Sequence, residues 1–451
     1  MPNLDTDTIC ALATPPGTGG LAVIRVSGPS AFSVADAASG SRSACASFAG
    51  HTLHRNRVVN ADGGVIDDVL VSVFHGPRSY TGEDVVEISA HGSPLIAGQI
   101  LARLLTCGAR LARPGEFTER AFLNGKLDLA QAEAVGDLIA AQTAEAQTLA
   151  RRQTEGRLSK AVQEIRSGVL GVLAQIEATI DFPEDVGELD NAACELTLGQ
   201  ANRQILELLA TADQGILVRE GLSVVLAGRP NVGKSSLLNA LLRTSRAIVT
   251  ALPGTTRDVL EETVNLNGVP LRLSDTAGLR ETDDEAEQLG VARTRATLHS
   301  ADIVLLVFDA VTGETPEDAD LRQSLAGRPH LVVWNKWDIT EQDALPTGGV
   351  AVSALTGWNL EVLEAAILDL ALSGTASRPE STLVTHSRHK QALHAAGQQI
   401  DQARTSLEAG LPADFASIDL RGALGALGTI TGETATEDVI AEIFRRFCIG
   451  K

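Results

Sequence analysis

The fold of the middle of the chain is decided by residues 228–235, which read GRPNVGKS. This segment follows the apolar run Leu222–Ala227 and precedes a stretch with helical spacing at Ser236–Leu242. A GxxxxGKS loop between a strand and a helix is typical of a P-loop, because its glycines let backbone N–H groups surround phosphates. The strand–loop–helix context favours this interpretation over a chance match on a turn. We predict phosphate contacts from Asn231, Val232, Gly233, Lys234, Ser235 and Ser236, with Lys234 at the β- and γ-phosphates and Ser235 on Mg²⁺.

A second motif, DTAG at residues 275–278, follows the strand-like run Leu271–Ser274. At this distance after a P-loop, its aspartate is expected to hold Mg²⁺ through water, and the amide of Gly278 is expected to sense the γ-phosphate. Between the two motifs, GTTRD at residues 254–258 offers a threonine that completes the Mg²⁺ shell when GTP is bound. We choose Thr256 for this ligand over Thr255. The residues predicted to contact the nucleotide here are Thr255, Thr256, Asp275, Thr276, Ala277 and Gly278.

The base is predicted from NKWD at residues 335–338, which follows another β-like run. The carboxylate of Asp338 can accept two hydrogen bonds from guanine N1–H and the 2-amino group, donors that adenine does not present in that pattern. Ser353-Ala354 fits the loop that backs the guanine, although Leu355 stands where many similar proteins have Lys. The base contacts are predicted at Asn335, Lys336, Asp338, Ser353 and Ala354. Together the motifs predict a GTP-hydrolysing domain.

The position after DTAG holds Leu279, where Ras-like GTPases have a Gln that orients the attacking water. An apolar side chain cannot orient water, so another group must do so. A run of carboxylates lies just downstream, at Glu281, Asp283, Asp284, Glu285 and Glu287. Such runs are usually solvated faces, and these residues alone do not single out one of them.

The amino-acid composition indicates a multidomain globular protein and argues against several other classes. With 451 residues and 47.2 kDa, two to four domains are expected, and 44% hydrophobic residues can build full cores. A net charge of −20 argues against a surface that binds nucleic acid throughout. The five cysteines are widely spaced without a CxxC motif, which favours a reducing compartment. Without a signal-peptide pattern or a long apolar run, we expect a cytoplasmic protein that does not insert into membranes.

Changes between strand-like and helical sequence patterns along the chain predict its domain boundaries. Short β-like runs at 21–26, 69–74 and 85–89 indicate an α+β domain, and long helical stretches follow. Strand-like runs then alternate with helical segments as in a parallel α/β sheet, and the last part of the chain again has a helical pattern. We therefore predict a multidomain α/β protein in which a Ras-like P-loop domain is inserted into a helical domain. The predicted domains are 1–118 (α+β), 119–219 (helical, first part), 220–376 (GTPase) and 377–451 (helical, second part).

Several motifs together resemble the MnmE/TrmE family of tRNA-modification GTPases. The GTPase motifs fit many proteins, whereas the block RPGEFTERAFLNGKLDLAQAEA at 113–134 and the terminal FCIGK at 447–451 are far more specific. TPPGTGG at 14–20 and SYTGEDVVE at 79–87 extend the match over essentially the whole chain.

The resemblance implies a fold and an activity. The N-terminal domain would resemble folate-binding aminomethyltransferase domains and form a homodimer. With an FAD-containing, NADH-using partner, MnmG/GidA, the protein would install an aminomethyl or carboxymethylaminomethyl group at C5 of the tRNA wobble uridine. The carbon would come from 5-formyltetrahydrofolate or a related tetrahydrofolate. The G domains would pair across the dimer when GTP and K⁺ are bound.

The resemblance also assigns residues for GTP hydrolysis. The family's potassium site falls on Asn231, Thr250, Leu252 and Thr255, with Thr250 also near the nucleotide. A monovalent cation there could neutralise charge between the β- and γ-phosphates. The family's water-positioning carboxylate matches Glu287, which resolves the choice that the acidic run left open.

The folate contacts of the family match Arg25, Glu87, Lys126 and Lys451. Cys448, within FCIGK, matches a proposed functional thiol, although a small packed hydrophobic residue is an equal interpretation from the sequence alone. Basic clusters could meet tRNA phosphates, but a solvated helix face is the simpler interpretation of each, and the partner is expected to contribute much of the tRNA binding. These clusters are Arg151, Arg152, Arg157 and Lys160; Arg388, His389 and Lys390; and Arg445 and Arg446.

Two other functions fit parts of the sequence. A ribosome-assembly GTPase would share the nucleotide motifs but should carry an RNA-binding appendage such as a KH GXXG loop beside basic strands, and we find no convincing one. A stand-alone folate-dependent aminomethyltransferase with a regulatory G domain would bind folate without depending on a flavin partner.

Overall fold

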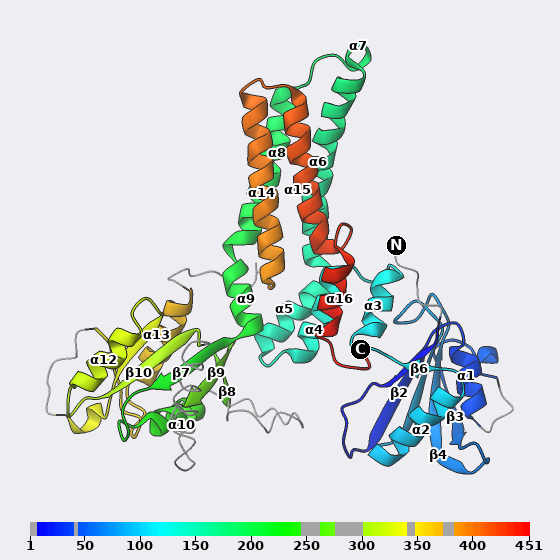
Figure 1. The fold of residues 1–451 in the computed structure, drawn as a ribbon, viewed down its shortest axis with the longest axis horizontal. Coiled ribbons are helices and arrows are strands. Elements are labelled where there is room, and N and C mark those ends of the chain that lie inside the picture. The colour runs from blue at the N-terminus through cyan, green and yellow to red at the C-terminus, as the bar shows by residue number, and fades with distance from the viewer. Residues whose placement is uncertain (1–6, 40–43, 245–261, 276–300, 341–347, 373–382) are drawn as a thin grey trace. The chain divides into compact units, whose positions relative to one another are not determined.

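The computed structural model describes residues 7–39, 44–244, 262–275, 301–340, 348–372 and 383–451 (Figure 1). The chain divides into two compact units. Unit 1 comprises Met1–Gly136, Gln153–Arg166 and Leu424–Lys451, and unit 2 comprises Asp137–Arg152 and Ser167–Ala423. The boundaries lie within helices α4 (Leu129–Ala140), α5 (Ala144–Thr154), α6 (Arg157–Asp181) and α15 (Ala413–Thr431).

A six-stranded sheet forms the centre of unit 1, in the order β3-β4-β5-β2-β1-β6. Its strands are β1 (Ile9–Leu12), β2 (Leu21–Ser27), β3 (Thr52–Val59), β4 (Val65–Phe74), β5 (Val85–His91) and β6 (Arg110–Leu111). Helices α1 (Ala31–Ala38) and α2 (Pro94–Thr106) contribute Val34, Ile100 and Leu104 to the apolar core against it. The three strand-like runs expected from the sequence lie in β2, β4 and β5, and the α+β class is confirmed.

The C-terminal segment of the chain lies against the N-terminal strands of unit 1. The backbone N–H of Phe117, in α3 (Glu116–Leu123), donates to the carbonyl of Lys451 over 3.2 Å, and Gly115 donates to Cys448 over 3.4 Å. Gly450 has φ +94°, and a Cβ there would lie 2.3 Å from the carbonyl oxygen of Leu12. The terminal residues therefore follow a path that requires glycine at position 450. Helix α16 (Glu437–Arg445) precedes them and buries Phe444.

A buried ionic network fixes α3 beside this terminal segment. The carboxylate of Glu116, 1% exposed, accepts hydrogen bonds from the guanidinium groups of Arg110 and Arg120. Arg120 also donates to Asp7 over 2.8 Å and to Glu83 over 3.1 Å. Burial raises the pKa of Glu116, but hydrogen bonds from Arg110, the Arg113 N–H and Arg120 outweigh it and lower the pKa to about 2.

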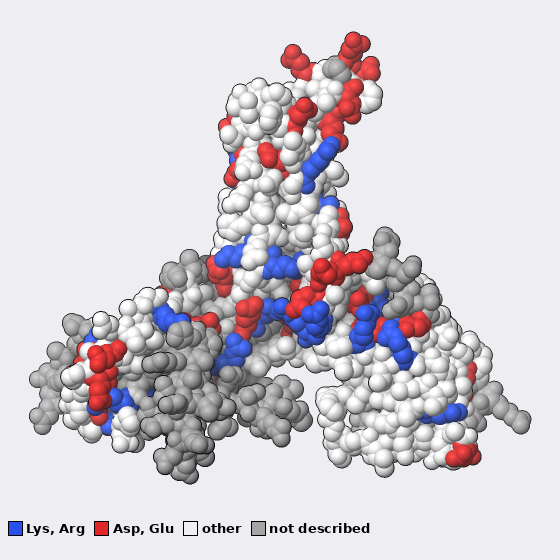
Figure 2. Space-filling model, viewed as in Figure 1, with Lys and Arg blue, Asp and Glu red and all other residues white. Residues whose placement is uncertain are grey.

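Unit 2 contains a bundle of long helices. Helix α8 (Asn191–Ala210) lies along α14 (Ser387–Glu408), and the parts of α6 and α15 within this unit join at the ion pair Glu177–Arg421. The sequence also predicts a helix over 194–213, which corresponds to α8, and α9 (Ala212–Glu220) follows it. Helix α8 begins at Asn191 because the Asp190 side chain caps it by accepting from the Ala193 N–H, and its C-cap is Thr211. Acidic side chains gather around α7 (Pro183–Val186), at the top of the view in Figure 2.

The rest of unit 2 is an α/β domain around a second six-stranded sheet, ordered β12-β11-β10-β7-β9-β8. Only β8 is antiparallel to its neighbour among the strands described. The strands are β7 (Leu222–Ala227), β8 (Glu262–Leu266), β9 (Val269–Asp275), β10 (Ile303–Asp309), β11 (His330–Asn335) and β12 (Val350–Ala351). Helices α10 (Lys234–Thr244), α12 (Pro316–Ser324) and α13 (Leu360–Leu372) accompany them. The strand-like runs expected at Leu222–Ala227, at Leu271–Ser274 and before NKWD lie in β7, β9 and β11.

None of the helices in the described parts of the chain combines the length and the apolar composition needed to cross a bilayer.

We predict that Glu116→Gln lowers the free energy of local opening of α3 by on the order of 3 kcal/mol, because two guanidinium groups lose their buried counter-charge. Hydrogen exchange of the α3 amides measures it. The wild-type contribution is complete above the ordinary carboxyl pKa of 4.5 and is lost as the pH falls towards 2, a dependence that the variant should lack. Glu119→Gln is the matched control, since its partner Arg113 is 60% exposed. Equal effects of the two substitutions would contradict the role given to Glu116.

Candidate functional site

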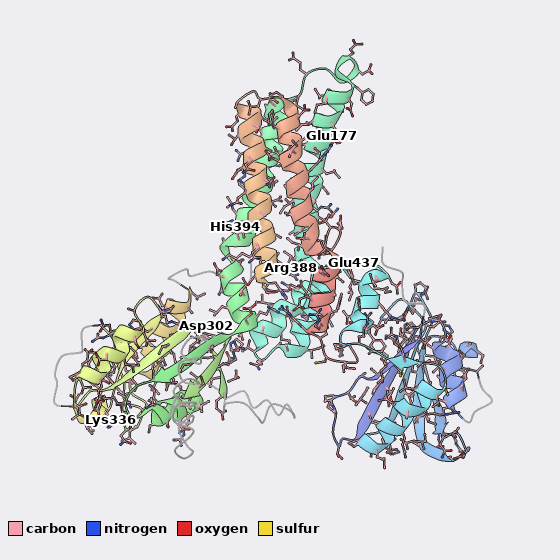
Figure 3. The ribbon with its side chains drawn as sticks, viewed as in Figure 1. Glu177, Asp302, Lys336, Arg388, His394 and Glu437 are labelled. Atoms are coloured by element: carbon pink, nitrogen blue, oxygen red, sulfur yellow. The ribbon has the colours of Figure 1, made fainter. Side chains whose placement is uncertain are left out.

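The nucleotide motifs of the α/β domain meet at one edge of its sheet. The P-loop follows β7, DTAG begins at the last residue of β9, and NKWD begins at the last residue of β11. These strands are parallel in the sheet, so their carboxyl ends lie together. Lys336 therefore lies at the edge away from Asp302, which precedes β10 (Figure 3). The P-loop, the NKWD motif and Asp275, the first residue of DTAG, thus lie at the same edge of the sheet.

Two glycines of the P-loop are required by close contacts. Gly228 has φ +152°, and a Cβ there would lie 2.4 Å from the carbonyl oxygen of Val307. Gly233 has φ +93°, and its Cβ would lie 2.2 Å from Nδ2 of Asn335. Only glycine fits at either position, so the loop keeps the tight backbone curve that a phosphate cradle needs.

Lys234 and Ser235 lie in the first turn of α10. The Lys234 side chain is 7% exposed, and its ammonium donates to the backbone carbonyls of Gly228 over 2.9 Å and Arg229 over 2.8 Å. The positive charge is thus held over the loop where a phosphate would lie. Ser235 is exposed and offers a hydroxyl oxygen, a ligand type that Mg²⁺ accepts. The loop fits a Mg²⁺–nucleotide phosphate group.

The side-chain amide of Asn335 joins three loops of the site. It is 2% exposed, its Nδ2 donates to the carbonyl of Val232 over 2.9 Å, and its Oδ1 accepts from the Ala354 N–H over 3.0 Å. One buried amide therefore connects the P-loop, the NKWD motif and the Ser353-Ala354 loop. This makes Asn335 a positioning residue for the other loops.

The carboxylate of Asp338 is exposed, at the start of the short helix η3 (Trp337–Ile339), and is accessible to a base. The neighbouring Lys336 pairs with Asp309 over 2.8 Å. Burial raises the pKa of Asp309, but the hydrogen bond from Lys336 and two backbone N–H groups lower it below its ordinary value. The Asp309 carboxylate is therefore ionised, and it holds the Lys336 side chain in place. Leu355, 86% exposed, lies next to the loop that would back the base.

Two further residues fix the P-loop, and sequence reasoning missed them. Arg229 donates from Nε to Asp318 over 3.0 Å, and the Asp318 side chain is fully buried. Asp318 also forms the capping box of α12 with Thr315, which joins the P-loop to the start of that helix. The sequence signal was the stretch TPED at 315–318, a capping-box pattern.

Several predicted residues lie outside the described part of the chain. They are Thr250, Leu252, Thr255, Thr256, Thr276, Ala277, Gly278 and Glu287. Of the DTAG motif, only the backbone of Asp275 is described, at the end of β9. Asn231, predicted for potassium, lies in the P-loop with φ +66° and is exposed. The Mg²⁺ and K⁺ ligand sets therefore stay predictions.

The four predicted folate residues all belong to unit 1. Arg25 of β2 and Glu87 of β5 are direct cross-strand partners and form an ion pair of 2.8 Å. The Arg25 guanidinium lies 5.4 Å from the ring centre of Tyr80 and 5.6 Å from that of Phe117. A half-buried ion pair beside two aromatic rings is suited to a planar, polar heterocycle such as a pterin.

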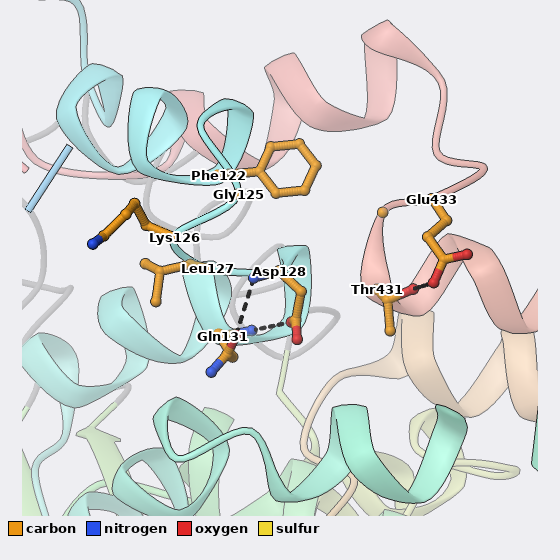
Figure 4. A pocket seen from close by; sticks show the side chains of 9 residues that line it. Phe122, Gly125, Lys126, Leu127, Asp128, Gln131, Thr431 and Glu433 are labelled. Carbon is orange, nitrogen blue, oxygen red and sulfur yellow. Dashed lines mark hydrogen bonds between the residues drawn. The ribbon is translucent and has the colours of Figure 1, made fainter. Parts of the chain in front are cut away.

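The two predicted folate lysines also belong to unit 1. Lys126 donates to the carbonyl of Pro77 over 2.9 Å and lines a pocket of about 410 Å³ (Figure 4). In this close-up its ammonium points away from Asp128 and Gln131, which cap each other's backbone N–H groups. The backbone of Lys451 is bonded to α3, and Cys448 is exposed. The described contacts thus join Arg25 directly to Glu87. They join the backbone of Lys451 to that pair through Phe117, whose N–H donates to the Lys451 carbonyl and whose ring lies 5.6 Å from the Arg25 guanidinium.

Several of the basic residues proposed for tRNA are already engaged. Arg445 and Arg446 both pair with Glu442, and Lys390 pairs with Asp213. Arg157 pairs with Glu155. Exposed pairs of this kind are weak and can exchange partners, so they rule out none of these four residues. His389 is fully buried, however, so the interpretation of this residue as a phosphate contact is wrong.

Comparison with known proteins identifies the family. The family model "MnmE helical domain" matches residues 129–448, and the model "GTP-binding protein TrmE N-terminus" matches residues 8–126. The "tRNA modification GTPase MnmE" of Listeria innocua is 43% identical over 99% of this chain and 100% of that protein. The protein of the same description from Chloroflexus aurantiacus is 48% identical, again over 99% of this chain and 100% of its own length. The chain belongs to the MnmE family.

Among solved structures, Era of Aquifex aeolicus bound to GDP·AlF4⁻ is 30% identical and covers 40% of this chain and 66% of its own. Its TM-score of 0.28 is too low to support a structural argument. The assignment to the MnmE family rests on the full-length sequence similarity and on both family models.

Proposed function

We propose that this protein uses GTP hydrolysis to drive a step in the modification of the tRNA wobble uridine. Its membership of the MnmE family makes it a GTP-hydrolysing enzyme that acts in tRNA modification. The observation that carries the proposal is the Asn335 amide, which holds the P-loop and the base-side loops in one site beside the exposed Asp338. Since its substrate class is tRNA, we also propose a cytoplasmic location.

The chain's own residues would divide the work of hydrolysis. Lys234 and the P-loop amides bind and orient the phosphates, while Asp338 selects guanine. Mg²⁺, held by Ser235 and Thr256, would neutralise charge on the β- and γ-phosphates. Glu287 would orient the attacking water in place of the Gln that Leu279 replaces. A K⁺ ion on Asn231, Thr250, Leu252 and Thr255 would supply a further positive charge.

The finer account of tRNA modification follows the resemblance. The product would be an aminomethyl or carboxymethylaminomethyl group at uridine C5, made with an FAD-dependent MnmG/GidA partner. The carbon donor would be 5-formyltetrahydrofolate or a related tetrahydrofolate at Arg25, Glu87, Lys126 and Lys451. The half-buried Arg25–Glu87 pair beside Tyr80 supports this choice of donor site. The protein would act as a homodimer whose G domains pair during hydrolysis, and Cys448 would supply an accessible thiol.

We predict that Asp338→Asn lowers the affinity for GTP by about 100-fold and raises that for xanthosine triphosphate, whose base matches an amide at this position. Competition of each nucleotide against a fluorescent guanine nucleotide measures both affinities. Asp302→Asn, at the opposite edge of the sheet, is the control and should leave the preference unchanged. If the Asp338 variant still prefers GTP as the wild type does, the assignment of the base-reading residue is wrong.

We predict that GTP turnover is at least about 10-fold faster in KCl than in NaCl at equal ionic strength, because K⁺ fits the proposed cation site. Asn231→Ala should lessen this difference while GTP still binds. The rate of phosphate release in each salt provides the measurement. Equal wild-type rates in the two salts would refute the potassium site and leave GTP binding itself untouched.

A further inference from the structure

The α/β domain of unit 2 meets helix α5 through a buried hydrogen bond at the tip of a β-hairpin. The turn between β8 and β9 contains Asn267 and Gly268, both with positive φ. The Thr143 hydroxyl, on a side chain that is 5% exposed, donates to the Gly268 carbonyl over 2.8 Å. The same oxygen accepts from the Ala146 N–H over 3.1 Å, as an N-cap of α5 does. One hydroxyl thus satisfies both the hairpin tip and the start of the helix.

This junction is tight and continues into the core of the domain. A Cβ on Gly268 would lie 2.6 Å from Cγ of Glu145, so the turn touches the first residues of α5. Ala146 and Leu149 of α5 are buried in the same apolar cluster as Leu266 and Val269 of the hairpin. Helix α5 therefore packs as part of the α/β core.

The same hairpin reaches the nucleotide edge of the sheet at its other end. Strand β9 begins at Val269, beside α5, and ends at Asp275, the first residue of DTAG. Seven residues of strand span about 20 Å from one end to the other. Strand β9 pairs in parallel with β7, the strand that leads into the P-loop, with Leu226 opposite Asp275. A displacement of β9 at the nucleotide edge would therefore also move Gly268 at the tip of the hairpin.

A pocket and a pair of salt bridges lie in unit 2 around this junction. A pocket of about 300 Å³ lies beside it, lined among others by Leu149, Leu217, Val269 and Leu368, so packing against α5 is incomplete on that side. The carboxylate of Asp137 contacts residues on both segments that connect the α/β domain to the helices. It pairs with Arg219, just before β7, over 2.6 Å, and with His386, just before α14, over 2.8 Å. The Asp137 pairs thus hold the two chain junctions, whereas the pocket leaves unfilled space on one side of α5.

We propose that Thr143 is the positioning residue through which the nucleotide state of the GTP site reaches helix α5, with the β8–β9 hairpin as the rigid element between them. The inference rests on the proposed function, because it needs GTP at the P-loop. It goes beyond the proposed function because it names the Thr143–Gly268 hydrogen bond as the contact that couples the nucleotide state to helix α5. Helix α5 packs against the G domain and spans a boundary between the two units, so it is one of the segments through which the chain of unit 2 continues into unit 1.

The test is hydrogen exchange of the full-length protein with GDP and with a non-hydrolysable GTP analogue. In the wild type, the α5 amides at residues 146–152 should change their exchange rate by about fivefold or more between the two states, the lower range of allosteric coupling. In Thr143→Val, which keeps the shape but lacks the hydroxyl, the change should fall below about twofold. Peptides that cover the P-loop should be protected by nucleotide in both proteins.

Two further variants separate coupling from a loss of structure. Thr143→Ser keeps the hydroxyl and should restore the response of α5. Thr148→Val removes an exposed hydroxyl bond to the Ala144 carbonyl from the same helix and should leave the response intact. An α5 response that is absent from the wild type, or that persists in Thr143→Val, would overturn the proposal, and the wild-type result needs no variant to fold. A P-loop that no nucleotide protects would instead refute the proposed function, and with it this inference.

Discussion

The buried amide of Asn335 is the contact on which the nucleotide site depends. It donates to the P-loop at Val232 and accepts from Ala354, so three loops that are remote in the sequence share one side chain. Its Nδ2 also leaves no room for a side chain at position 233. A loop that moved away from this amide would leave one of its buried polar atoms unpaired, at a cost of about 1–3 kcal/mol, so the amide favours joint displacement of the loops. The Arg229–Asp318 and Lys336–Asp309 pairs hold the same arrangement from its two sides.

In unit 1, charged side chains join segments that are distant in the sequence. Glu116 gathers Arg110 and Arg120, which in turn hold Asp7 and Glu83, and the C-terminal residues bond to the backbone of the same helix. Glu116 and Arg120 of this network are buried, whereas Arg110 and Asp7 are partly exposed, and removing one partner of a buried pair leaves an uncompensated charge. In each unit, then, a buried polar side chain joins segments that are distant in the sequence.

Sequence reasoning located the GTP motifs because each needs particular residue types directly after a strand. It missed β3, whose polar residues His54, Arg55 and Arg57 interrupt the apolar pattern, and β6, which has only two residues. It placed a helix over 194–213, close to α8, but it did not predict α9, whose start at Thr211 carries no glycine or proline signal. The Arg229–Asp318 pair joins residues 89 positions apart, and single-sequence patterns hold no information on such partners. The folate residues came from family resemblance alone, since isolated charges on strands usually face solvent.

The central claim is that this site binds and hydrolyses a guanine nucleotide. Turnover of GTP and of ATP by the purified full-length protein, at equal concentrations with Mg²⁺ and K⁺, tests it most directly. We predict that GTP is hydrolysed at least about 100-fold faster than ATP, since a site built to bond guanine leaves the Asp338 carboxylate unpaired with adenine. Comparable rates for the two nucleotides, or no hydrolysis of either, would contradict the account.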